Sequence, residues 1–171
     1  VEVESGDVTA VGEPAMIWGV DVAPDGRHAR VELLQKPFST IVPVNNFGRA
    51  EELWDRSGTR LAQVAEREMN LGTDGNALIA PGVGGEEEDP EKRQVEWHSD
   101  GASLTFITAE RGDDGYEQEE DDDEGRTDRV VVWTAPFGEG DQTAVYTHDG
   151  PLEAYAFAPE HGFLFLREEE E

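Results

Sequence analysis

The chain has 171 residues and no cysteine, and 40 acidic residues against 13 basic ones give it a formal net charge of −27. The absence of thiols excludes disulfides, thiolate metal sites and a cysteine nucleophile. The charge argues against nucleic acid as a partner, because phosphates would be repelled. No apolar run approaches the roughly 20 residues that span a bilayer, which argues against membrane insertion.

The acidic residues have two explanations that the sequence leaves open. Many stand in runs, 86–89, 117–124 and 168–171, which are typical of solvated loops or tails. Others lie within predicted strands, and lysine is nearly absent, as in proteins of salt-loving organisms whose surroundings screen self-repulsion. A moderately halophilic source is therefore a second expectation. We also expect the chain, which opens on Val1 without a methionine, to begin inside a longer protein, so its compartment stays open.

The first predicted elements are a strand and turn over residues 1–12, followed by a β-hairpin. Residues 17–22 and 29–33 alternate between apolar and polar side chains, as strands with one buried face do. The turn between them, Ala23-Pro24-Asp25-Gly26, combines a fixed proline φ with a glycine that tolerates positive φ. Prolines then keep residues 36–44 extended.

Two strands, 51–55 and 60–65, are predicted next, joined by a turn at 55–58. The glycine-rich and acidic stretch 72–92 is predicted to be a long loop.

The hairpin pattern then recurs twice. Residues 94–98 and 103–108 flank Ser99-Asp100-Gly101, and an acidic loop over 110–128 separates them from strands at 129–133 and 142–147. The third copy pairs 152–158 with 163–166 across a turn at 159–162.

Four strands with such a turn between the first two fit a propeller blade enlarged by loops. The predicted fold is therefore all-β: a partial β-propeller of antiparallel sheets, with about two complete four-stranded blades plus flanking strands. The predicted blade-like units are 13–67, 93–147 and 151–167, with acidic loops at 82–92 and 110–128.

Several blocks of sequence resemble the propeller of prolyl-oligopeptidase-family serine peptidases, in the glutamyl-endopeptidase-like branch. They are Gly12-Glu13-Pro14-Ala15-Met16, the turn at 23–26, Lys36-Pro37-Phe38-Ser39 with Ile41-Val42-Pro43, and Glu52-Leu53-Trp54-Asp55. Thr40 stands where the family motif has its second aromatic residue. The resemblance implies a propeller segment that gates and shapes substrate access to an α/β-hydrolase domain of the same parent chain. That domain is outside this sequence, which has no Gly-x-Ser-x-Gly nucleophile elbow.

The residues singled out as candidates for the substrate cleft are Lys36, Phe38, Ser39 and Arg49. The first three belong to the most specific motif. Lys36 supplies a rare positive charge that would suit an acidic peptide substrate, and Arg49 could act similarly. The alternative is that Lys36-Pro37 ends an edge strand and guards it against sheet addition. No catalytic residue, cofactor or metal site is predicted.

Other candidate sites in the sequence have simpler structural interpretations. A triad of Ser99, His98 and Asp100 cannot align on one turn, and His161 is assigned to turn structure. The acidic loop lacks the spacing of an EF-hand, so a solvated loop is favoured, with loose binding of divalent ions as the alternative. The four tryptophans, Trp18, Trp54, Trp97 and Trp133, are expected to fill space between packed sheets rather than form a binding platform.

The sequence thus leads to two functional hypotheses. The first is a non-catalytic propeller segment of a serine peptidase, whose partners are a peptide substrate and the hydrolase domain. The alternative is a propeller protein-interaction module with no hydrolase activity.

Overall fold

The computed structural model describes residues 4–70, 92–111, 126–158 and 162–168. Ten β-strands and two short 3-10 turns make up its regular structure, with no α-helix among these residues. The chain divides into two compact units, Val1–Glu86 and Glu87–Glu171, and each is described by itself. The predicted all-β class is confirmed.

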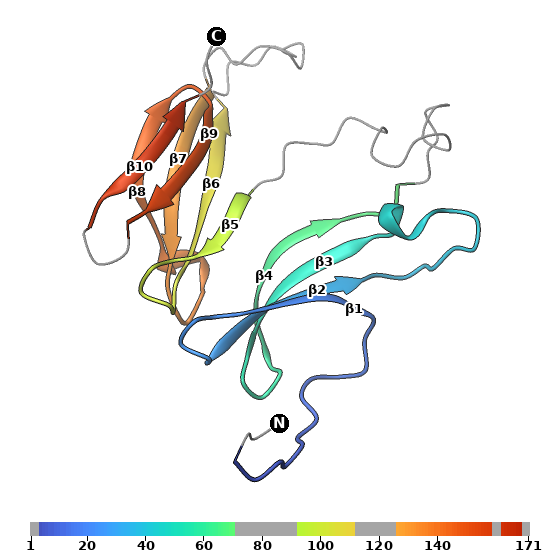
Figure 1. Cartoon of the computed structure of the whole chain (residues 1–171). Helices are drawn as coiled ribbons and strands as arrows, with labels where there is room; N and C mark the ends of the chain where they lie inside the picture. Colours follow the sequence, from blue (N-terminus) through green and yellow to red (C-terminus); the bar gives the residue numbers. More distant parts are fainter. Residues whose placement is uncertain (1–3, 71–91, 112–125, 159–161, 169–171) are drawn as a thin grey trace. The chain divides into compact units, whose positions relative to one another are not determined.

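The first unit is a four-stranded antiparallel sheet in the order β1-β2-β3-β4 (Figure 1). Its strands are β1 (Ile17–Val22), β2 (His28–Leu34), β3 (Arg49–Asp55) and β4 (Arg60–Arg67). The predicted first turn forms: Gly26 has φ +67°, and its N–H donates to the Ala23 carbonyl at 2.8 Å. Strand order therefore follows sequence order, as in a propeller blade.

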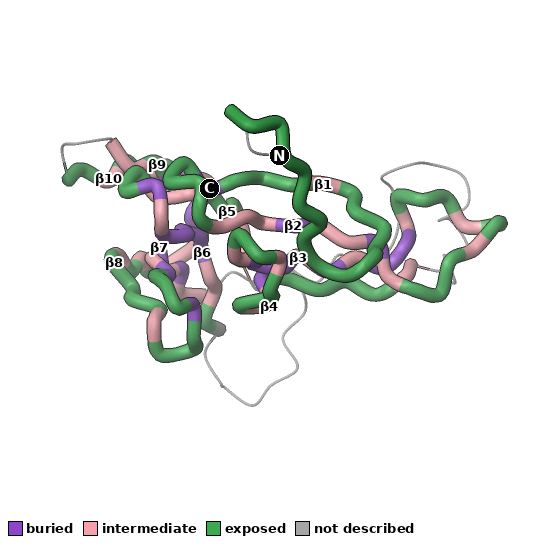
Figure 2. The backbone as a smooth tube through the Cα atoms, turned by 90° about the horizontal axis from the view of Figure 1, so that it is seen from below, coloured by how far each residue is buried: buried purple, intermediate pink, exposed green. Residues whose placement is uncertain are grey.

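The two faces of this sheet differ in chemistry. Val31 pairs with Glu52, and Ala29 with Trp54, so these residues share one face, which we call the apolar face. The opposite face carries ion pairs, including Arg30 Nε to Glu51 Oε1 at 2.5 Å. Strand β1 forms an edge of the sheet and is exposed along nearly all of its length (Figure 2).

The described part of the segment 1–12, residues 4–12, contains no strand, and residues 1–3 of the predicted strand lie outside the described residues. At its end, Gly12 lies against the Trp54 ring and Gly58. A Cβ at Gly58 would come 2.1 Å from the Gly12 nitrogen. Close backbone approach, rather than strand pairing, holds this part of the chain.

The second unit contains a four-stranded antiparallel sheet and a two-stranded one. The larger sheet has the order β5-β6-β7-β8 and the smaller one pairs β9 with β10 (Figure 1). The strands are β5 (Arg93–Trp97), β6 (Leu104–Arg111), β7 (Arg126–Trp133), β8 (Gln142–Asp149), β9 (Leu152–Phe157) and β10 (Leu164–Glu168).

The acidic loop is shorter at both ends than the predicted range of 110–128. Glu110 and Arg111 belong to β6, and residues 126–128 belong to β7. Glu110 pairs with Thr127 in the ladder between the two strands. The charged composition that suggested a loop is carried by strands here, because ladder hydrogen bonds do not depend on side-chain polarity. The remaining loop residues, and most of 82–92, lie outside the described residues.

The core of the second unit joins its two sheets. Ile107 and Val130 from the larger sheet pack with Leu152 and Tyr155 from β9, and all four are buried. Tyr155 donates its hydroxyl hydrogen in a hydrogen bond of 2.8 Å to the Gln94 carbonyl or the Thr105 hydroxyl, which both lie at that distance. The β9–β10 hairpin is therefore a packed part of the unit.

Two complete four-stranded meanders and a further hairpin thus confirm the expected blade-like architecture. No helix in the described part of the chain is long and apolar enough to cross a membrane.

Candidate functional site

The loop between β2 and β3, residues 35–48, carries the motif singled out from the sequence. The N–H of Gln35 donates to the Gly48 carbonyl at 2.7 Å and closes the base of the loop. The bond between Lys36 and Pro37 is cis. Near its end the loop forms a 3-10 turn, η1 (Val44–Asn46). The hydrogen bond at its base and the 3-10 turn therefore give this loop a defined conformation.

Ser39 stabilises the loop from within. Its Oγ accepts hydrogen bonds from the N–H groups of Ile41 and Val42, both at 3.1 Å. Serine hydroxyls commonly bond backbone N–H groups two or three residues ahead in turns. This position gives Ser39 a structural role in the loop.

Lys36 and Phe38 line a hollow of about 440 Å³, which we call the loop hollow. Phe38 stacks on the buried ring of Phe47, with centroids 5.9 Å apart, yet keeps 42% of its surface exposed. The floor belongs to the apolar face, and the lining also includes Pro14, Met16, Leu33, Ala50 and Glu52. An apolar side chain of a ligand can therefore enter beside an aromatic ring.

The charges around the loop hollow are arranged unequally. Glu52 is nearly buried, and its carboxylate accepts from Trp54 Nε1 at 2.7 Å and pairs with Arg60 at 3.1 Å. Lys36 is exposed and forms no ion pair with any described residue. The lysine is thus the cation available to a ligand carboxylate at this hollow, since Glu52 is already neutralised.

Arg49 does not join this site. It neighbours Ala50 on β3, and successive strand residues point to opposite faces, so its side chain lies on the ion-paired face. There Arg49 Nη1 donates to Glu32 Oε1 at 2.6 Å, and its guanidinium lies 4.6 Å from the centre of the Trp18 ring. The structure therefore brings Lys36 and Phe38 together and places Arg49 elsewhere.

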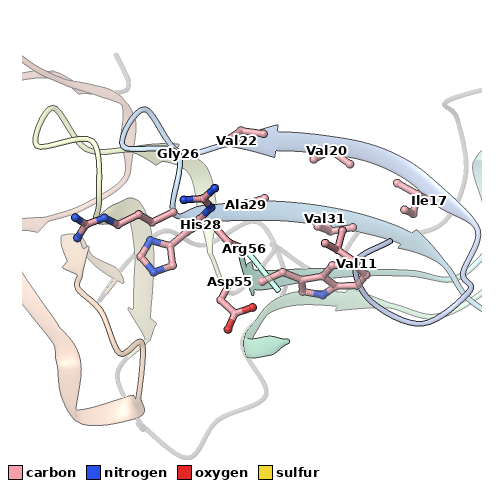
Figure 3. Close-up of a pocket in the computed structure, with 12 residues that line it drawn as sticks. Val11, Ile17, Val20, Val22, Gly26, His28, Ala29, Val31, Asp55 and Arg56 are labelled. Carbon is pink, nitrogen blue, oxygen red and sulfur yellow. The ribbon is translucent and has the colours of Figure 1, made fainter. Parts of the chain in front are cut away.

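A second hollow, of about 220 Å³, was not foreseen; we call it the turn hollow. Figure 3 shows Val20 and Val22 on β1 and Val31 on β2 along it, with Arg56 among the other residues that line it. Trp54 and Arg27 also line it. The signal for this hollow was the apolar alternation of β1, which sequence reasoning assigned to a buried face, whereas Val20 and Val22 are more than half exposed.

The hairpin at His98 is structural, as the sequence suggested. Asp100 accepts from the N–H of Ala102 and Ser103 and from the Ser103 hydroxyl, while its carboxylate lies 3.2 Å from His98 Nδ1. Burial alone would raise the pKa of Asp100, but these hydrogen bonds and His98 outweigh it and lower the pKa to about 2. Ser99 takes no part in these contacts, so the residues form a turn network and not a triad.

Asp128 on β7 is a buried acid of the second unit. Its side chain is wholly buried and accepts from Arg93, from Arg126 Nε at 2.9 Å and from the Leu152 N–H at 2.7 Å. Burial works to raise the pKa of Asp128, but the Leu152 N–H and the two arginines lower it below its usual value. This cluster is structural, because it links β7 to β9 and the Asp128 carboxylate is already paired with both arginines.

The tryptophans predicted to fill the space between sheets differ in their burial. Trp54 and Trp133 are buried as expected, but Trp18 is 46% exposed, so it does not fill a core.

No group of three metal-ligating side chains occurs among the residues that the structure describes. His161 and the acidic residues 112–125 lie outside those residues.

Comparison with known proteins gives similarity over part of the chain. No family model matches. A probable chloroplastic glutamyl endopeptidase of Oryza sativa subsp. japonica is 30% identical over 61 residues, which are 36% of this chain and 6% of that protein. A probable chloroplastic glutamyl endopeptidase of Arabidopsis thaliana is 27% identical over 112 residues, 64% of this chain and 10% of that one. The chain thus spans a tenth or less of the length of these relatives.

Two solved structures are also similar. Acylaminoacyl peptidase of Pyrococcus horikoshii matches with a TM-score of 0.41 and 12% identity over 91% of this chain and 24% of that one. Hydrazine synthase of Kuenenia stuttgartiensis matches with a TM-score of 0.41 and 15% identity over 86% of this chain and 35% of that one.

Proposed function

We propose that the chain is a propeller segment of a serine peptidase of the prolyl-oligopeptidase family and is not catalytic by itself. In the parent protein an α/β-hydrolase domain would hydrolyse peptide bonds, and this segment would gate and shape the path of the substrate. The observation that carries the proposal is the similarity to glutamyl endopeptidases over 112 residues. The blade-like meanders of both units fit the same role.

Within that role we assign peptide contact to the loop hollow. Lys36 supplies a cation for a substrate carboxylate, and Phe38 supplies an exposed aromatic edge beside the apolar floor. Ser39 and Arg49 hold their surroundings in place through backbone and ion-pair contacts. The site therefore selects peptides and carries out no chemistry.

The experiment uses the full-length gene product. A fluorophosphonate probe, which labels activated serines, is expected to label it, and no labelling would refute the peptidase assignment. That result would leave the alternative of a propeller interaction module.

The variant Lys36→Glu tests the loop hollow separately. It is expected to raise KM about tenfold for a long acidic peptide while leaving a small chromogenic amide unchanged, since one charge-assisted contact is lost and replaced by repulsion. Ile41→Ser is the matched control, because Ile41 lies in the same loop, is 84% exposed and lines neither hollow. Equal effects on both substrates would contradict the role of Lys36.

A further inference from the structure

Strand β1 leaves one side of its backbone without a partner strand. It is an edge of its sheet, and in the described part of the chain it pairs only with β2. The Ala23 N–H donates to the His28 carbonyl at 2.9 Å, so these two residues form a hydrogen-bonded pair. Hydrogen-bonded and non-hydrogen-bonded pairs alternate in antiparallel sheets. The N–H and C=O groups of Val20 and Val22 therefore point away from β2, and we call this side of β1 the open edge.

The open edge lacks the usual protection of an edge strand. Natural edge strands are guarded by proline, by charged side chains, especially lysine, or by a covering loop. Residues Ile17–Val22 include no proline, lysine or arginine, whereas β4, at the other edge of the sheet, begins and ends with arginine. Val20 and Val22 are 56% and 58% exposed. Such an edge is a template for the addition of another strand.

The two faces of β1 specify the side chains of an added strand. Val20 and Val22 lie on the apolar face, opposite apolar residues of β2, and line the turn hollow (Figure 3). Asp21 between them lies on the ion-paired face, where its side chain is 57% exposed and 3.3 Å from Arg30. A strand beside β1 thus has apolar neighbours at every second residue and a carboxylate between them.

Charge favours a basic peptide as the added strand. The net charge of −27 repels a second copy of this chain and attracts a basic partner. Arg27 and Arg56 also line the turn hollow, but they stand in the turns after β1 and β3 and not on β1 itself. The charged residue that directly borders an added strand is therefore Asp21.

We propose that the open edge binds an extended peptide in which apolar residues alternate with lysine or arginine. The peptide pairs antiparallel with β1, as β2 does on the other side, and adds one strand to the sheet. Its apolar side chains contact Val20 and Val22, and a basic side chain lies beside Asp21. Main-chain hydrogen bonds supply affinity, and the alternating side chains supply specificity. This site shares no lining residue with the loop hollow and does not rest on the peptidase proposal.

The test measures binding of a short fluorescent peptide that alternates valine and lysine, by anisotropy at low salt with the whole chain. Saturable binding with a Kd of about 100 μM or below is expected. A control peptide with the same valines and lysines in two separate blocks has the same charge. Without alternation it cannot place its valines on one face, and it is expected to bind at least about tenfold more weakly.

Backbone methylation tests strand addition directly. In antiparallel pairing the peptide residues opposite Val20 and Val22 lie on the same face and direct their N–H groups at β1. Methylation of the valine nitrogens of the peptide is therefore expected to abolish binding. Methylation of the lysine nitrogens alters only the outer side of the peptide and is expected to preserve it.

Two variants of the chain separate the backbone from the charge. Val20→Pro removes an outward N–H without touching the ladder to β2, which edge strands tolerate, and is expected to weaken binding about tenfold. Asp21→Lys places a like charge beside the peptide and is expected to weaken binding about threefold or more. Ile41→Ser, which changes an exposed residue outside both hollows, is expected to bind like the wild type. Far-UV circular dichroism verifies that each variant folds.

The proposal is wrong if the block peptide or the valine-methylated peptide binds as tightly as the alternating one, because the acidic surface alone would then explain binding. An unchanged affinity in Val20→Pro would also overturn it. So would a wild-type dimer in sedimentation velocity that Val20→Pro abolishes, since a second copy would then occupy the open edge. These outcomes are independent of fluorophosphonate labelling, so a failure here leaves the proposed peptidase role standing.

Discussion

Replacing Asp128 with asparagine is expected to loosen the β9–β10 hairpin from the larger sheet of the second unit. The wild-type carboxylate is wholly buried between Arg93 and Arg126 and also accepts the Leu152 N–H. Asparagine is nearly the same shape, and its carbonyl oxygen can still accept from Leu152. What is lost is the negative charge between two guanidinium groups.

The size of the effect follows from the burial of the pair. Removing one partner of a buried ion pair costs about 3–5 kcal/mol, because the remaining charge is left uncompensated. Since the asparagine keeps one hydrogen bond, we take the lower end, about 3 kcal/mol. For a unit of this size that corresponds to a fall in Tm of roughly 12–24 °C.

The assay is urea unfolding followed by tryptophan fluorescence, with hydrogen exchange at the Leu152 amide as a local measure. The matched control is Glu110→Gln, which removes the exposed pair between Glu110 and Arg129 and should cost less than about 1 kcal/mol. A loss below about 1 kcal/mol for Asp128→Asn, with unchanged exchange at Leu152, would refute the buried-cluster reasoning.

Acid titration provides the second measure. The pKa of Asp128 is lowered in the folded state. Its stabilisation is therefore fully present above the ordinary aspartate pKa of about 4 and disappears as the pH falls through the lowered value. The variant is expected to lack this acid step.

Three further predictions concern single contacts. Gly58→Ala places a Cβ against the Gly12 nitrogen at positive φ and should cost about 2 kcal/mol or more in a thermal melt. The control Gly26→Ala, also at positive φ but with no atom within 4 Å, should cost about 1 kcal/mol, and equal losses would contradict the clash. Asp100 should titrate near pH 2 by carboxyl NMR, so its turn loses stability only as the pH falls from about 4 toward 2; an ordinary pKa would contradict the turn network. Tyr155→Phe should cost about 1–2 kcal/mol through its lost hydroxyl hydrogen bonds, and a neutral urea midpoint would show that they contribute nothing.

The site illustrates how far a local pattern reaches. The motif at Lys36 and Phe38 predicted a functional loop, and the structure places both at one hollow. Arg49 was grouped with them by charge, yet strand alternation places it on the opposite face. Asp128 was assigned to an acidic loop, because nothing near it in the sequence reveals Arg93 or the Leu152 N–H as its partners.

The sequence by itself determined the hairpins, the strand alternation and the all-β class. Turn preferences and the two-residue period act between neighbours in the chain, so residues such as Asp25 and Gly26 state them directly. Only the tertiary structure decided that Arg27 and Arg56 line one hollow, that β1 leaves its valines exposed, and that Asp128 joins two sheets. Those outcomes depend on strand register and packing between residues distant in sequence, which no local pattern encodes.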